Sequence, residues 1–233
     1  MNLTDSLRQL VGDTAVLDAA DVATRSAGYL RPDNLKAAAL VRPANTDEVA
    51  QVMRWCFANK VGVVTHGGLT GLVHGGDAAP DEVILSLERM RAIEDIDPVQ
   101  RTATVQAGVV LQTLQAAVDE HGLAFPLDLG ARGSATLGGN AAVNAGGNRV
   151  IRYGMTREMV LGIEAVMADG AIVSSLNRLI KNNAGYDLKH LFIGSEGTLG
   201  VITRLVLRLR ERPTTTNMAF VGLDSFAAVA RFL

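Results

Sequence analysis

The chain has 233 residues, of which 48% are apolar and 20% charged, and its net charge is −2. This composition is typical of a folded globular protein and excludes a disordered chain. No cluster of Lys and Arg points to nucleic acid or an anionic membrane surface, so we expect a small-molecule ligand. No stretch reaches the roughly 18 apolar residues of a membrane span, and the N-terminus lacks the features of a signal peptide. We therefore expect a cytoplasmic protein.

Cysteine and histidine usage argues against a metal centre. The single cysteine, Cys56, excludes an internal disulfide and a thiolate zinc site, and we expect it in the core or against Trp55. The four histidines are not spaced as a ligand set, so no metal is predicted. They are His66, His74, His121 and His190.

The first half of the chain alternates strand and helix patterns. Residues 1–37 contain a short amphipathic helix and a polar passage in which no chemistry is evident. A β-α-β unit follows, whose helix begins at Asn45 or Thr46 and has acidic residues in its first turn. An Asp97-Pro98 turn joins two later strands. The expected elements are a helix at 45–60 and strands at 38–43, 61–65, 82–87, 90–97 and 101–108.

The second half ends in an incomplete unit. We expect a helix at 110–122 that ends at Gly122, and a hairpin at 159–175 with a type I′ turn at Asp169-Gly170. A long strand is predicted at 197–213. Residues 214–233 predict a strand and a helix without a C-terminal cap, so we interpret the sequence as truncated, either in cloning or as a gene fragment.

The stretch from Gly130 to Gly154 is the most informative part of the sequence. Seven of its 25 residues are glycine, and no Lys or Arg occurs from Gly133 to Asn148. Such a segment exposes backbone N–H groups that can bind a phosphate without ion pairs. The alternative, a flexible linker, is less consistent with the strand pattern that follows. Residues 66–76 form another glycine-rich loop without Lys or Arg after a predicted strand, and 194–200 form a further glycine cluster.

Several nucleotide and hydrolase motifs are excluded. No two glycines lie two positions apart, so the GxGxxG dinucleotide fingerprint is impossible. None of the four lysines follows a glycine, which excludes a P-loop. No His-Glu pair or nucleophile elbow occurs either. Neutral glycine-rich loops after strands, with a slot between packed layers, are what a large dinucleotide requires.

Taken together, these motifs resemble the FAD-binding domain of the vanillyl-alcohol oxidase and para-cresol methylhydroxylase (PCMH-type) flavoproteins. The resemblance covers 38–213 and rests on HGGLTG, PLDLGARGSATLGGNAAVNAGG, RYG and GYDLKHLFIGSEGTLGVIT, in that order. It is strongest to the branch of the D-2-hydroxyglutarate and D-lactate dehydrogenases, which includes the glycolate oxidase FAD subunit.

This resemblance implies an α+β fold. The FAD-binding domain at 38–213 would consist of two α+β subdomains, about 38–90 and 91–213, with FAD between them. An N-terminal helical lead-in at 1–37 would precede it, and 214–233 would be the first strand and helix of a truncated C-terminal substrate (cap) domain.

The resemblance also implies the cofactor-binding residues. Gly67, Gly68, Leu69, Thr70 and Gly71 would wrap the pyrophosphate, joined by Gly133, Thr136, Gly138, Gly139 and Asn140. Asn144, Ala145, Gly146, Gly147, Tyr153 and Gly154 would line the flavin and ribityl side. Glu196, Gly197, Gly200 and Ile202 match adenine-end and backbone contacts, and Pro126 and Asp128 match the approach to the isoalloxazine ring. For Leu69, Glu196 and Ile202, a packing or turn-capping role is the alternative. A Val at Gly68 or Gly139 would abolish FAD binding and leave the fold largely intact.

Two positions depart from the family. His66 stands where relatives commonly carry Arg or Gln, and Leu69 stands where covalently flavinylated relatives carry the linking histidine. FAD is therefore expected to be non-covalent.

The implied function is oxidation of a D-2-hydroxy acid (2-hydroxyglutarate, lactate or glycolate type) to the 2-oxo acid, by hydride transfer to flavin N5. The catalytic half would lie in the missing domain, so no catalytic residue is assigned, and the fragment alone is expected to be inactive. Exposed apolar residues near the C-terminus would favour a homo-oligomer or a partner chain. The electron acceptor stays unidentified. Two alternatives remain: a non-catalytic FAD-binding subunit that needs a partner chain, and a reductase of the cell-wall precursor type.

Overall fold

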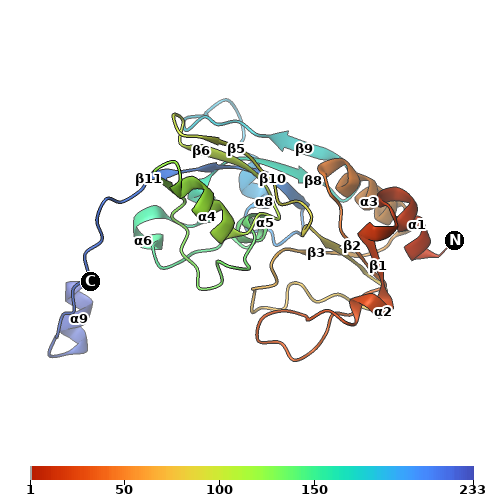
Figure 1. The fold of residues 1–233 in the computed structure, drawn as a ribbon, viewed down its shortest axis with the longest axis horizontal. Helices are drawn as coiled ribbons and strands as arrows, with labels where there is room; N and C mark the ends of the chain where they lie inside the picture. The colour runs from red at the N-terminus through yellow and green to blue at the C-terminus, as the bar shows by residue number, and fades with distance from the viewer. Residues whose placement is uncertain (1) are drawn as a thin grey trace.

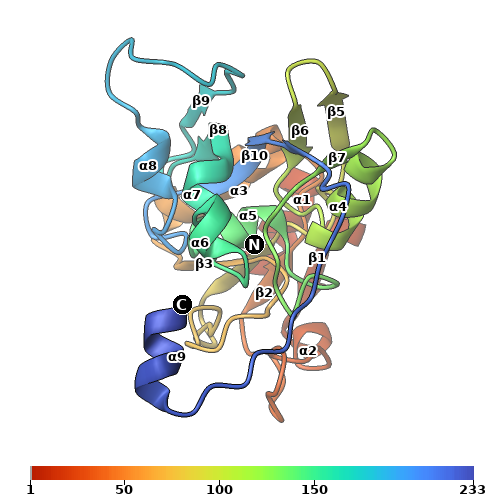
Figure 2. The ribbon, with the colours of Figure 1, turned by 90° about the vertical axis from the view of Figure 1, so that its left-hand side faces the viewer.

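The structure is a computed structural model that describes residues 2–233. Two sheets lie side by side, with helices packed around them and a C-terminal helix that stands apart from the rest (Figures 1 and 2). The helices are α1 (Leu3–Val11), η1 (Asp13–Ala15), α2 (Ala19–Val22), α3 (Thr46–Asn59), α4 (Leu111–Asp119), α5 (Leu137–Ala142), α6 (Val150–Tyr153), α7 (Thr156–Met159), α8 (Lys189–Phe192) and α9 (Phe226–Phe232). Within residues 2–233, no helix is long and apolar enough to cross a membrane.

The first sheet has the strand order β1-β2-β4-β3, with β1 (Val16–Asp18), β2 (Ala39–Val41), β3 (Val63–His66) and β4 (Val83–Ser86). β2, β4 and β3 are parallel, as the predicted β-α-β unit requires, and β4 lies between the other two. Asn45 caps α3 by accepting a hydrogen bond from the Glu48 N–H at 2.9 Å. β1 comes from the 1–37 segment, which therefore contributes a strand as well as a helix.

Both faces of this sheet are covered. Side chains alternate along a strand, so Ala39 and Val41 point to one face and Leu40 to the other. Ala39 and Val41 join a core that also contains Val49 and Val52 of α3 and extends to the second sheet. Leu40 packs on the opposite face in a separate cluster with Val22, Leu35, Ala37 and Ile84. The later part of the 1–37 segment, with Val22, Leu35 and Ala37, thus covers this second face, while Leu7 and Val16 of the same segment join the larger core.

The second sheet is antiparallel, in the order β5-β6-β10-β8-β9, and a small pair, β11-β7, follows it. Its strands are β5 (Ile93–Asp97), β6 (Thr102–Gln106), β8 (Val160–Val166), β9 (Ile172–Ser175) and β10 (Val201–Arg208), and the pair is β7 (Leu123–Ala124) with β11 (Arg210–Glu211). A buried carboxylate links this sheet to α3: Glu164 on β8 accepts a hydrogen bond from the Thr46 hydroxyl, at the start of α3, at 2.7 Å.

Three local predictions were wrong. The strand expected at 197–213 begins at Val201, because residues 194–200 form turns. The Asp169-Gly170 turn is not type I′, since that type needs positive φ at both residues and only Gly170, with φ 81°, has it. No strand forms between 212 and 225, where no neighbouring strand supplies hydrogen-bond partners, so only the helix α9 is found in 214–233.

Candidate functional site

A cleft of about 410 Å³ lies where the two sheets meet. One wall is the glycine-rich loop 66–76, which we call the first loop and which lies between β3 and β4. The other wall is formed by residues 129–145, which include α5 and which we call the second loop, and by the turn and strand start at 196–202. The carboxyl ends of neighbouring parallel strands meet at one edge of a sheet. Thr65 and His66, at the end of β3, therefore lie beside Leu87, which follows β4, and all three line the cleft.

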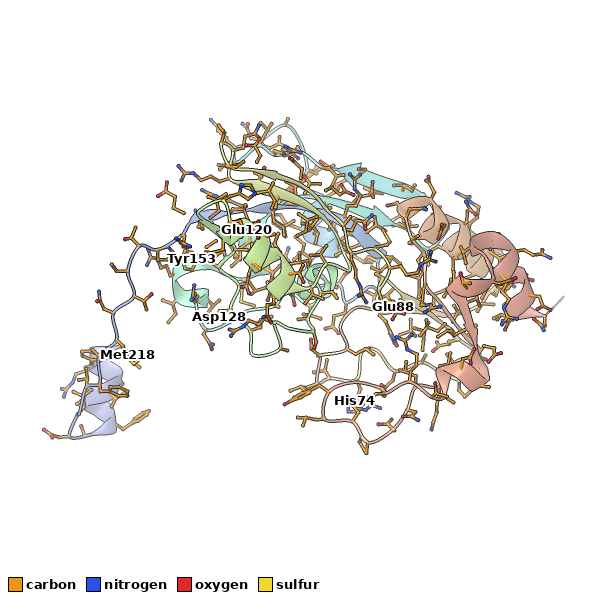
Figure 3. All side chains as sticks on the ribbon, in the orientation of Figure 1. His74, Glu88, Glu120, Asp128, Tyr153 and Met218 are labelled. Carbon is orange, nitrogen blue, oxygen red and sulfur yellow. The ribbon has the colours of Figure 1, made fainter. Side chains whose placement is uncertain are left out.

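The structure brings most of the predicted site residues to this one cleft. Fourteen of them line it: Gly67, Gly68, Leu69, Thr70, Gly71, Thr136, Gly138, Gly139, Asn140, Ala145, Glu196, Gly197, Gly200 and Ile202. The other eight do not: Pro126, Asp128, Gly133, Asn144, Gly146, Gly147, Tyr153 and Gly154. Asp128 and Tyr153 lie on the α6 side of the molecule, away from His74 on the first loop (Figure 3). Direct cofactor contacts stay a prediction for the whole set.

Residues outside the lining hold the second loop in place. Asn144, with φ 48°, accepts a hydrogen bond from the Arg157 N–H at 3.0 Å. A Cβ on Gly147 would lie 2.1 Å from the carbonyl oxygen of Asp128, so only glycine fits there. The Asp128 carboxylate faces Arg132 at 3.4 Å and Arg149 at 3.7 Å. These contacts explain the conformation of the loop without a ligand.

The first loop offers free backbone donors. From Gly67 to Gly71, no N–H group donates a hydrogen bond to another residue within 2–233. Leu69 has a φ of 51°, in the left-handed region. Backbone nests that bind anions contain a residue in this region. This loop therefore has the donor set that an anionic ligand requires.

The second loop offers fewer free donors than its sequence suggests. The Gly138 N–H donates to the Ala107 carbonyl at 2.8 Å, and the Gly139 N–H donates to the Thr136 hydroxyl at 3.3 Å. The Asn140 N–H is also bonded within the helix, to the Thr136 carbonyl at 2.8 Å. A Cβ on Gly138 would lie 2.5 Å from the Ala107 Cβ, so Gly138 allows α5 to pack on the end of β6. The backbone of this loop is mainly structural.

The Asn140 side chain is the exception. It lines the cleft, is 96% buried, and its Nδ2 has no hydrogen-bond partner among the described residues. A buried donor without a partner costs about 1–3 kcal/mol, and buried polar groups in folded proteins are nearly always paired. An acceptor atom on a ligand in the cleft would satisfy it.

His66 and Glu196, which both line the cleft, also make contacts that hold its walls. Burial lowers the pKa of His66, and its Nε2 lies 2.7 Å from the Gly76 carbonyl oxygen, so the neutral ring donates from Nε2. His66 therefore fastens the loop and adds no positive charge. The Glu196 N–H donates to the Ala142 carbonyl at the end of α5, at 2.9 Å. Its carboxylate reaches toward Gly75, where an added Cβ would lie 3.2 Å from Oε2.

The cleft also contains residues that the sequence did not reveal. Ala27 and Arg31, from the segment in which no chemistry was evident, line it together with His74 and Asp77. No glycine-rich or periodic stretch marks the residues around Ala27 and Arg31, so only the fold could have found them. Among residues 2–233, no group of three or more His, Cys, Asp or Glu side chains is placed to hold a metal.

Comparisons with known proteins agree with this site. A family model described as an FAD binding domain matches residues 37–175. The chain is similar to the D-2-hydroxyglutarate dehydrogenase of Xanthomonas citri pv. viticola, with 48% identity over 81% of this chain and 40% of that protein. It is 44% identical to the mitochondrial D-2-hydroxyglutarate dehydrogenase of Bos taurus, over 96% of this chain and 41% of that protein. A solved structure of alkyldihydroxyacetonephosphate synthase superposes with a TM-score of 0.79, at 22% identity, over 91% of this chain and 40% of that one.

The fold is the α+β fold that the sequence predicts, and the solved structure of alkyldihydroxyacetonephosphate synthase shares it. The chain belongs to the FAD binding domain family, and its cofactor is FAD. It spans about two fifths of the length of the curated relatives it matches.

Proposed function

We propose that this chain is the FAD-binding part of a flavin-dependent dehydrogenase that oxidises a D-2-hydroxy acid of the 2-hydroxyglutarate type to the 2-oxo acid. Two relatives that share 44% and 48% identity with it are named D-2-hydroxyglutarate dehydrogenases. The chain covers about two fifths of each, so the substrate and the electron acceptor are proposed for the whole protein. D-lactate and glycolate are the alternative substrates to test.

The main structural support for cofactor binding is the Nδ2 atom of Asn140, which is buried in the wall of the cleft and has no hydrogen-bond partner among the described residues. Across the cleft, the N–H groups of 67–71 are free to donate. FAD carries pyrophosphate oxygens and flavin carbonyl groups, which are acceptors that both sets of donors fit. Since no unpaired Lys or Arg of the described chain lines the cleft, the phosphate charge would be balanced by backbone dipoles.

Bound FAD supplies a two-electron acceptor for the hydride on C2 of the hydroxy acid. The residues of this chain bind it, orient it and exclude water from its buried side. His66 is a poor base, because it is buried and burial lowers its pKa. We assign no catalytic residue within 2–233.

We propose that the cofactor is held without a covalent bond. Leu69 offers no nucleophile, and Cys56 is buried outside the cleft lining. Burial raises the pKa of the Cys56 thiol to about 11, which keeps it protonated and unreactive. Acid precipitation of the FAD-loaded protein should release all flavin into the supernatant. Flavin that stays with the pellet after washing in denaturant would contradict this.

Replacement of Asn140 tests the cofactor site. Asn140→Leu removes a buried donor that has no protein partner, so the apoprotein should be as stable as the wild type or more stable. FAD affinity should fall roughly tenfold or more, since about 1.4 kcal/mol is a factor of ten. The measurements are spectral titration with FAD and thermal unfolding without it. Asn217→Leu, at an exposed position outside the cleft, is the matched control and should change neither affinity nor stability greatly.

Flavin reduction tests the substrate class. In the protein at the length its gene encodes, D-2-hydroxyglutarate should bleach the visible flavin band under anaerobic conditions, and the L-enantiomer should not. If dithionite reduces the bound flavin but D-2-hydroxyglutarate, D-lactate and glycolate all fail, the proposed activity is wrong while FAD binding stands.

A further inference from the structure

A segment outside the matched FAD family region crosses the first glycine-rich loop. Residues 24–34, which we call the N-terminal strap, fold back on themselves through the Ser26–Asn34 bridge. The Tyr29 N–H donates to the Leu69 carbonyl at 3.3 Å. Gly28 approaches the same carbonyl so closely that an added Cβ would lie 2.8 Å from its oxygen. The strap therefore packs directly on the loop that carries the free N–H groups.

Arg31 ties the strap to the far end of that loop. Its guanidinium lies 2.6 Å from the Asp33 carboxylate within the strap and 2.6 Å from the Asp77 carboxylate beyond the loop. The same Nη1 is 2.8 Å from Nδ1 of His74. With Tyr29 bonded to Leu69, the strap contacts the loop near its start and near its end.

The charges argue against Arg31 as a direct phosphate ligand. Its hydrogen bond lowers the pKa of Asp33 to about 2, and also lowers the pKa of Asp77, so both carboxylates are ionised at neutral pH. One positive charge against two negative charges leaves the cluster with a net charge of −1, which does not attract an anion. The contribution of Arg31 must then come from the geometry that it imposes on the loop.

The loop has a conformation that needs support. Leu69 and His74 have φ values of 51° and 62°, in the left-handed region that residues with a side chain rarely adopt. Each such residue costs roughly 1–2 kcal/mol, so it persists only where its surroundings hold it. Tyr29 bonds the carbonyl of Leu69, and Arg31 contacts the ring of His74. Both strained residues are therefore held by the strap.

We propose that Arg31 is a positioning residue for FAD: by pairing with Asp77 it holds loop 66–76 in the conformation that presents its free N–H groups to the cofactor. This inference rests on the proposed cofactor site. Without Arg31, the loop would sample other conformations, and apparent affinity falls by the fraction of molecules that remain competent to bind.

The variant Arg31→Gln tests the inference. FAD should bind roughly tenfold more weakly, as expected when about a tenth of the molecules are competent, and it should dissociate faster. The thermal midpoint of the apoprotein should stay close to that of the wild type, because the paired groups are on the surface. Arg8→Gln is the control, since among the described residues Arg8 makes two ion contacts, both of 3.9 Å, to Asp5 on α1 and Asp18 on β1. It should leave FAD affinity unchanged.

A double-mutant cycle separates positioning through Asp77 from a general loss of stability. If Arg31 acts through Asp77, Arg31→Gln, Asp77→Asn and the double variant should all weaken FAD binding by a similar factor. If the double variant loses FAD affinity by the product of the two single losses, the two residues act independently and the proposal is overturned. An unchanged FAD affinity in Arg31→Gln would overturn it as well. If Arg31→Gln fails to fold, the cycle is run with Arg31→Met, which also removes the ion pair, under the same two criteria. A wild-type chain that does not bind FAD would refute the cofactor site itself, which is a distinct outcome.

Discussion

A Cβ atom placed on Gly68 would lie 2.0 Å from the carbonyl oxygen of Ser134. The two glycine-rich loops therefore touch through their backbones at this point, before any ligand is considered. The expectation that a side chain at Gly68 would spare the fold is thus wrong, because that side chain would meet protein.

Gly68→Ala should destabilise the protein and weaken FAD binding together. The added methyl group cannot be accommodated without separating the loops, and overpacking of this kind costs about 1–3 kcal/mol. Thermal unfolding of the apoprotein is the measurement. An apoprotein of wild-type stability that fails to bind FAD would show that Gly68 serves the ligand and not the loop junction.

Unlike Gly68→Ala, Gly71→Val should weaken FAD binding without destabilising the apoprotein. Gly71 lines the cleft, an added Cβ would meet no atom within 4 Å, and its φ is outside the left-handed region. The apoprotein should therefore keep its stability, while FAD affinity falls because the branched side chain occupies ligand space. Gly222→Val, also in open space but in the segment before α9, is the control. Equal FAD affinity in the two variants would exclude Gly71 from the binding site.

The Arg25–Glu88 pair should make stability depend on pH in the acid range. Two hydrogen bonds, of 3.1 and 2.5 Å, join the guanidinium to the carboxylate, and Arg42 lies 3.5 Å away. Burial alone would raise the pKa of Glu88, but the bonds from Arg25 and the charges of both arginines lower it below its ordinary 4.5. A lowered pKa stabilises the fold above 4.5, and this stabilisation is lost as pH falls through the folded-state value.

Glu88→Gln should therefore lower the free energy of unfolding by roughly 1.5 kcal/mol at neutral pH. Well below 4.5, the difference between wild type and variant should shrink toward zero. Urea unfolding across this pH range measures it. A difference that is constant with pH would assign the effect to packing.

The sequence predicted the elements with strong periodicity and missed features set by tertiary contacts. The helices at α3 and α4 and the strands β5 and β6 follow from apolar spacing and local caps. The turn at Gly170 depends on α3, because a Cβ on Gly170 would lie 2.6 Å from the Ala50 carbonyl oxygen. No local pattern carries that information.

In the candidate site, too, some features could be predicted from the sequence and others depend on tertiary contacts. The glycine-rich loops were visible because their composition is unusual, and the fold brings them to one cleft. Which N–H groups remain free was not visible, since Gly138 is satisfied by Ala107, a residue about thirty positions earlier in the chain. The N-terminal strap has an ordinary polar sequence, and its role depends on the distant partners Leu69 and Asp77.

Hydrogen exchange of the backbone from Gly67 to Gly71, with and without FAD, tests the central claim most directly. Without FAD these N–H groups have no partner within residues 2–233, so they should exchange at rates close to those of an unstructured peptide. Saturating FAD should slow them strongly, while the amides of 214–223 keep their rates. If FAD binds, as shown by its spectrum, and exchange from Gly67 to Gly71 is unchanged, the cofactor is held elsewhere and the proposed site is wrong.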